Sequence, residues 1–246
     1  MIKKIFLLIL FTALVVNCKK ERQDADVIVR KSIEVSGGNK IESATINFDF
    51  RNKHYKATRD NEQFQLERTF KDSTDIIRDI LSNDGFQRFI NNKPFEVSDG
   101  KEVSYSASVN SVHYFSVLPY GLDNSAVKRT YFGITKVKGK DYYKIKITFN
   151  EDGGGEDFED VFIYWINTET FEADYLAYSY EENNGIGVRF REAYNERIIE
   201  GIRFVDYNNY KPKGNDVVLE KLDLKFENDD LELLSKIELE NVLVSL

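Results

Sequence analysis

The chain has 246 residues and a formal net charge of −8 at pH 7. A surface of this sign repels phosphate backbones, and no dense cluster of lysines and arginines interrupts it, so nucleic acid is excluded as the expected partner. Aromatic residues make up 13% of the chain. Because each large aromatic side chain buries much apolar area, we expect a substantial hydrophobic core.

Residues 1–17 have the features of a lipoprotein signal peptide. Lys3 and Lys4 precede the largely apolar residues 5–16, and Cys18 stands at the expected cleavage point. The apolar run is too short for a membrane-spanning helix, which needs about 20 residues. The small residues of an ordinary signal-peptide cleavage site are also missing. We therefore predict a lipoprotein leader rather than a transmembrane helix.

The segment before Cys18 resembles a lipobox, with one departure. Asn17 stands where Gly, Ala or Ser is usual. A thiol is the nucleophile that accepts diacylglycerol, so we predict a lipid anchor on Cys18 and a short tether over residues 18–23. Cys18 is the only cysteine, which excludes an internal disulfide and a thiolate metal cluster.

Residues 24–246 are predicted to form a single domain, because only three prolines occur and no Ser/Pro/Gly-rich linker divides the chain. Asp24 is placed to cap a helix over 25–36, which Gly37 and Gly38 would end. Apolar residues then alternate with polar ones over 44–50 and 64–70, which predicts strands. Residues 76–81 fit either a strand or a helical turn, and a short strand is predicted over 86–90.

A second helix is predicted to follow. Asp99 and Glu102 have capping-box spacing, and Pro119 follows a run of apolar residues at helical intervals. Those apolar residues are Tyr105, Val109, Val112 and Phe115.

From Tyr131 onward the pattern again predicts strands joined by short turns. The predicted runs include 143–149, 161–166, 173–180, 188–194, 202–207, 222–226 and 237–244. Short connections require antiparallel pairing, and sheets that approach ten strands tend to curl. The expected fold is α+β, a large curved antiparallel sheet (a half-open β-barrel) with two main helices packed on its concave side.

The sequence contains no complete catalytic or metal-binding motif. His113 lies on the second predicted helix beside Tyr114 and Phe115, and it could act as a general base, but we favour an interfacial histidine with satisfied hydrogen bonds. The acidic segment 152–160 lacks the spacing of a calcium loop, and its glycines are not followed by the Lys-Ser/Thr of a phosphate loop. We predict no catalytic residue, no metal and no cofactor.

Arg189-Phe190-Arg191 is a candidate anion site. Alternation along a strand puts both guanidinium groups on one face, where they could hold an anionic headgroup or a carboxylate, and Arg203 could join them. The alternative, which we rank above an anion site, is cross-strand pairing of the arginines with Glu181, Glu182 or Glu192.

Several blocks together resemble a family of Gram-negative lipoproteins of uncharacterised function, from about Val27 to the C-terminus. The blocks are 110–115, 118–122, 137–145, 153–166, 174–178, 187–191 and 201–207. The opening helix, Gly37-Gly38 and the next strand also resemble the start of lipoprotein carriers of the LolA/LppX kind. That second resemblance implies a curved sheet around a hydrophobic cavity closed by helices.

The sequence is compatible with three functions. The leading hypothesis is an outer-membrane lipoprotein, facing the periplasm or the cell surface, that binds an apolar or lipid-like ligand. The alternatives are a structural or protein-interaction lipoprotein without a small ligand and, ranked last, a hydrolase that uses His113. The predicted ligand-binding residues are His113, Tyr114, Phe115, Tyr164, Trp165, Tyr178, Arg189 and Arg191.

Overall fold

The computed structural model describes residues 24–153, 158–182, 185–214 and 217–246. The predicted signal peptide, Cys18 with its predicted lipid anchor and the predicted tether lie outside the described residues. The same holds for the turn at Asn183-Asn184 and for part of the glycine-rich turn near Gly154.

The described residues form two antiparallel sheets of seven strands each. Sheet A has the order β14-β1-β2-β3-β4-β5-β6. Its strands are β1 (Thr45–Phe50), β2 (Lys53–Asp60), β3 (Gln63–Asp72), β4 (Asp75–Ser82), β5 (Gly85–Ile90), β6 (Lys93–Phe95) and β14 (Glu240–Ser245).

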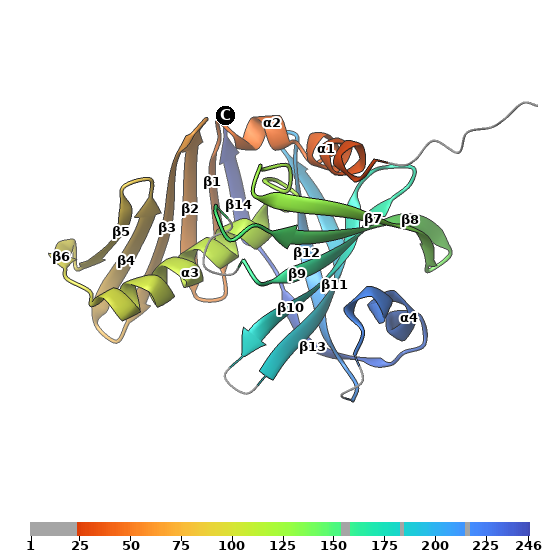
Figure 1. The fold of residues 1–246 in the computed structure, drawn as a ribbon. Helices are drawn as coiled ribbons and strands as arrows, with labels where there is room; N and C mark the ends of the chain where they lie inside the picture. The colour runs from red at the N-terminus through yellow and green to blue at the C-terminus, as the bar shows by residue number, and fades with distance from the viewer. Residues whose placement is uncertain (1–23, 154–157, 183–184, 215–216) are drawn as a thin grey trace, which may run out of the picture.

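Sheet B has the order β13-β12-β11-β10-β9-β8-β7. Its strands are β7 (Val127–Val137), β8 (Lys140–Phe149), β9 (Val161–Asn167), β10 (Ala173–Glu182), β11 (Gly185–Ile199), β12 (Ile202–Pro212) and β13 (Leu231–Ile237). Figure 1 shows the two sheets side by side, with β1 and β14 next to the strands of sheet B.

The predicted fold class is confirmed, since the sheets are antiparallel, open and accompanied by helices. The strands are divided between two sheets rather than joined in one, and β14 returns from the C-terminus to pair with β1 at the edge of sheet A. The ambiguous residues 76–81 belong to β4, which pairs with β3 and β5. Asn61 and Asn91 adopt the left-handed backbone conformation in tight hairpin turns, a role that asparagine tolerates well.

The two longest helices are α1 (Ala25–Val35) and α3 (Asp99–Ser116). The Asp24 side chain accepts a hydrogen bond from the Asp26 backbone N–H, as expected of a cap. The predicted capping role of Asp99 is wrong, because Ser98 occupies the cap position and Asp99 lies in the first turn of α3. Helix α3 lies diagonally across sheet A and contacts β3 and β4 (Figure 1).

The strand predicted over 222–226 is a short helix, α4 (Leu222–Glu227), which follows the 3₁₀ turn η1 (Leu219–Lys221). Leu222 and Phe226 are buried, whereas Leu224 is 53% exposed. Residues four apart share a helix face, so this burial pattern fits a helix and not a half-buried strand. The apparent alternation of three apolar residues was misleading. A four-residue helix, α2 (Gly38–Ile41), links α1 to β1.

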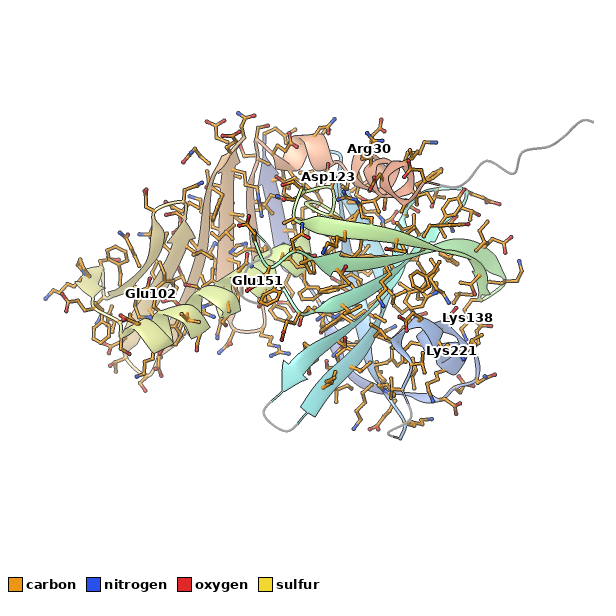
Figure 2. The ribbon with its side chains drawn as sticks, in the orientation of Figure 1. Arg30, Glu102, Asp123, Lys138, Glu151 and Lys221 are labelled. Atoms are coloured by element: carbon orange, nitrogen blue, oxygen red, sulfur yellow. The ribbon has the colours of Figure 1, made fainter. Side chains whose placement is uncertain are left out.

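Both faces of sheet B are covered. Tyr143, Phe162 and Tyr164 pack with α1 and the end of α3 on one face, which we call the inner face. Trp165 and Phe190 pack with α4 on the other, outer face. Figure 2 labels Lys138 and Lys221 beside α4, and Glu102 on α3 at the opposite end of the molecule. The inner face of sheet B therefore looks toward α3 and sheet A.

Candidate ligand cavity

A cavity of about 480 Å³ lies where the two sheets and α3 meet. The turn after β1 closes one side, and the last two turns of α3 close another. The inner face of β10, β11, β12 and β13 forms the remaining wall. The site is therefore built from segments far apart in the sequence.

The cavity has a mixed lining. Aromatic and aliphatic side chains contribute Phe50, Val112, Phe115, Tyr178, Tyr180, Val205, Tyr207, Ile237 and Leu239. The polar and charged residues are Arg51, Ser111, Ser116, Glu159, Asp160, Arg191, Asn209 and Ser235. Rings from β1, α3, β10 and β12 contribute most of the apolar lining. The charged residues of the lining are two arginines and two acids.

Arg191 is the buried charge of this cavity, with 7% of its surface exposed. Its guanidinium carbon lies 3.9 Å from the centroid of the Phe115 ring and 4.9 Å from that of Tyr178. Nη2 donates a hydrogen bond of 2.8 Å to the Tyr178 hydroxyl. These contacts hold the cation by stacking on π faces, which attract it electrostatically.

Three of the eight residues predicted to bind a ligand line this cavity, namely Phe115, Tyr178 and Arg191. Phe115 lies on α3, whereas Tyr178 and Arg191 lie on the adjacent strands β10 and β11. The Phe115 and Tyr178 rings are 5.4 Å apart between centroids. Helix α3 and sheet B thus bring these three side chains together.

Tyr114 and Tyr164 lie in the core behind the cavity rather than in its lining. The Tyr114 ring packs edge-on against Phe115 and Phe162, and Tyr164 is fully buried on β9. Burial raises the pKa of Tyr114 to about 12, so the phenol is neutral at physiological pH. Both tyrosines support the cavity wall by packing.

Trp165 faces away from the cavity. Successive strand residues point to opposite faces, so Trp165 cannot share the inner face with Tyr164. It is fully buried on the outer face, where its ring packs edge-on against Phe190 at 5.4 Å between centroids. The prediction that Tyr164 and Trp165 belong to one site is therefore wrong, because the two side chains lie on opposite faces of sheet B.

His113 is fully buried on the side of α3 that packs against sheet A, and it does not line the cavity. Its Nε2 lies 2.9 Å from the Glu67 carbonyl oxygen, and its ring packs edge-on against Phe48 and Tyr55. Burial lowers its pKa to about 4. A general base must reach its substrate, so the geometry gives no support to a hydrolase that uses His113.

The three arginines proposed as one group do not gather at the cavity. Arg189 and Arg191 share the inner face of β11, as their two-residue spacing predicts, but only Arg191 lines the cavity. Arg189 is half-buried and does not line the cavity; its guanidinium stacks over Tyr180 and its Nη1 donates to the Val188 carbonyl oxygen. Arg203 binds Glu196 at 2.6 Å. The strand register explains the separation of Arg203, because β12 places Asn209 opposite Arg191 and Arg203 opposite Ile198.

Sequence reasoning missed several lining residues. Val205 and Tyr207 could have been found from their two-residue spacing within the predicted strand 202–207. Phe50 and Arg51 could not, because they come from the other sheet and no local pattern reports contacts between sheets.

None of the described helices combines the length and apolar character needed to cross a membrane. Within the described residues, no three His, Cys, Asp or Glu side chains gather in a way that could hold a metal ion.

Solved structures with similar folds come from several bacteria. A LolA superfamily protein from Nitrosomonas europaea has 11% identity and a TM-score of 0.46, with 91% of this chain and 92% of that chain covered. A DUF1329 family protein from Desulfovibrio piger has 10% identity and a TM-score of 0.42, with 89% and 92% covered. The lipoprotein LppX of Mycobacterium tuberculosis has 12% identity and a TM-score of 0.29, with 63% and 87% covered.

At the level of sequence, no functionally curated protein shows significant similarity to the chain. A family model does match, and it spans residues 3–240. The chain belongs to the family of unknown function DUF6503.

Proposed function

We propose that this protein is an exported, membrane-anchored lipoprotein that holds an apolar or lipid-like ligand in the cavity between α3 and sheet B. The observation that carries the proposal is the cavity itself, with a volume of about 480 Å³ and rings from four elements (β1, α3, β10 and β12) in its lining. Sites for small organic ligands typically measure about 300–1,000 Å³ and are lined mainly by apolar groups.

The volume restricts the size of the ligand. At about 480 Å³ the cavity lies in the lower half of the usual range. It suits one acyl chain or a compact ring system better than a bundle of chains. Transfer of such a chain from water onto the Phe115, Tyr178 and Tyr207 rings is favourable, because apolar burial contributes about 25 cal/mol per Å².

Filling the cavity from α3 should weaken ligand binding. Ser111 is half-buried and lines the cavity, and the Ser111→Phe substitution adds a ring where the ligand would lie. We expect affinity for the neutral probe oleyl alcohol to fall about tenfold or more, since overfilled sites resist an additional occupant. Native mass spectrometry of residues 19–246, with titration of the probe, measures the bound fraction.

Ser104 provides a matched control on the same helix. It is exposed and lies outside the cavity lining, so Ser104→Phe should leave affinity unchanged. Equal affinities in the wild type, the Ser111→Phe variant and the Ser104→Phe variant would place any bound ligand elsewhere. A wild-type protein that binds no oleyl alcohol would favour the alternative of an interaction lipoprotein.

The lipid anchor is a separate part of the proposal and rests on the sequence before Cys18. Cells fed a radiolabelled or clickable fatty acid should incorporate the label into the wild-type protein, and the Cys18→Ala variant should remain unlabelled, because only the thiol accepts diacylglycerol. Fractionation of the envelope should recover the wild type with the outer membrane. Labelling of the Cys18→Ala variant would contradict the proposal.

A further inference from the structure

Arg191 differs from the other buried arginines of the described residues. Arg68 is bound to Asp79 at 2.6 Å, and Arg203 is bound to Glu196 at the same distance. No carboxylate in the described ranges lies within ion-pair distance of Arg191, although the side chain is 93% buried (7% exposed). Its guanidinium group stacks on three aromatic rings and donates a hydrogen bond to one hydroxyl.

The guanidinium group also retains unused donors. Nη2 donates to the Tyr178 hydroxyl at 2.8 Å, whereas Nε and Nη1 have no hydrogen-bond acceptor among the described residues. An arginine has five N–H donors in a fixed planar fork, and buried polar groups are normally satisfied. A buried cation without a counter-charge is costly, so an anion that reaches this position would be stabilised.

The remaining charges of the cavity restrict what that anion can be. Arg51, Arg191, Glu159 and Asp160 give the lining a formal charge of zero, with two cations and two anions. A singly charged group would leave one excess negative charge in the cavity, whereas a doubly charged group would leave two. Repulsion from Glu159 and Asp160 therefore disfavours a doubly charged headgroup.

The surroundings of Arg191 add an apolar requirement. The Phe115, Tyr178 and Tyr207 rings lie within 5.8 Å of its guanidinium carbon, and Val205 and Ile237 line the same cavity. A small hydrophilic anion would leave these apolar surfaces uncovered. An anion joined to a hydrocarbon chain satisfies both the charge and the rings.

We propose that the cavity receives a single-chain amphiphile with a singly charged anionic headgroup, such as a long-chain carboxylate, and that Arg191 binds this headgroup. The inference rests on the proposed function, because it concerns the ligand of the same cavity. It adds the chemical class of the ligand and assigns the residue that selects it.

The test compares two probes with the same chain, oleate and oleyl alcohol, by native mass spectrometry and by competition with each other. Wild-type protein should bind oleate about 10–100-fold more tightly than oleyl alcohol, which is the effect of charge-assisted hydrogen bonds in a buried site. Arg191→Gln should lose this preference and keep its affinity for oleyl alcohol. Arg191→Lys keeps the positive charge but lacks the planar guanidinium group with its parallel N–H donors, so it should retain part of the preference for oleate.

Arg189→Gln is the matched control, because it removes an arginine from the same strand but outside the cavity lining. It should preserve the wild-type preference for oleate. Thermal unfolding of each variant verifies that it is folded, and the wild-type comparison of the two probes stands even if Arg191→Gln does not fold.

The outcomes separate the two proposals. Wild-type protein that binds oleyl alcohol as tightly as oleate overturns the role of Arg191 and leaves the cavity proposal standing. An equal loss of both probes in Arg191→Gln also overturns it, because the arginine would then only shape the cavity. Wild-type protein that binds neither probe overturns the proposed function and the inference together.

Discussion

Replacing Asp79 by asparagine should lower the free energy of unfolding by about 3–5 kcal/mol, the usual cost of breaking a buried ion pair from one side. Asp79 on β4 is fully buried. It accepts hydrogen bonds from Arg68 Nη2 and from Arg88 Nε, each at 2.6 Å. An asparagine amide would leave both guanidinium groups without a counter-charge in a buried site.

The same cluster positions α3 over sheet A. Arg68 also donates a hydrogen bond of 2.6 Å to the Ser108 hydroxyl, and the Arg88 guanidinium carbon lies 3.6 Å from the Tyr105 ring centroid. Both partners belong to α3. Because the end of α3 forms one wall of the cavity, Asp79→Asn should also weaken ligand binding in protein that is still folded.

Equilibrium urea denaturation, with the midpoint and slope fitted together, measures this effect. Asp141→Asn is the matched control, because Asp141 is 54% exposed and pairs with Lys136 at 2.9 Å on the surface. Exposed pairs contribute about 0–1 kcal/mol, so the control should unfold close to the wild type. If the free energy of unfolding falls by a similar small amount in both variants, the Asp79 cluster is not a major source of stability.

Local patterns predicted the strands well where short turns separate them. Tyr143, Ile145 and Ile147 were expected on one face of a strand, and all three are buried in the inner-face cluster of sheet B. The capped helix α1 was predictable for a similar reason, since Asp24 and Gly37 mark its ends. In each case the determining interactions lie within a few residues of the chain.

Properties that depend on distant segments were not predictable. The pairing of β14 with β1 joins residues that are about 200 positions apart in the chain, for example Thr45 with Ser245, and no local periodicity reports it. The contacts of Phe115 with Arg191 likewise require α3 and sheet B to be placed first. The sequence could therefore suggest Arg191 as a candidate, but not that Arg189 and Arg203 would lie elsewhere.

His113 should make the stability of the protein dependent on pH between about 6.5 and about 4. Its Nε2–H donates to the Glu67 carbonyl oxygen, and its Nδ1 is buried without a hydrogen-bond partner among the described residues. Protonation would therefore place a charge on Nδ1 with no acceptor. Burial lowers the pKa of His113 from 6.5 to about 4 in the folded protein.

Proton binding by the unfolded chain determines whether stability rises or falls with pH. Between pH 6.5 and about 4 the unfolded chain binds a proton at His113 that the folded protein does not, so stability rises with pH in this window. The contribution is fully present above pH 6.5 and is lost as the pH falls toward 4. A shift of this size corresponds to about 3 kcal/mol.

Urea denaturation of the wild type and of His113→Gln at pH 7.5, 5.5 and 4.5 tests this prediction. Glutamine can still donate to the Glu67 carbonyl oxygen but does not titrate. The variant should be less stable at pH 7.5, and the gap should narrow by about 2–3 kcal/mol at pH 4.5. Acids with lowered pKa, including Asp49 and Asp206, also destabilise the fold at low pH, but they do so in both proteins. The difference between the two proteins therefore isolates His113, and parallel pH profiles would show that its imidazole is protonated at the same pH in the folded and unfolded states.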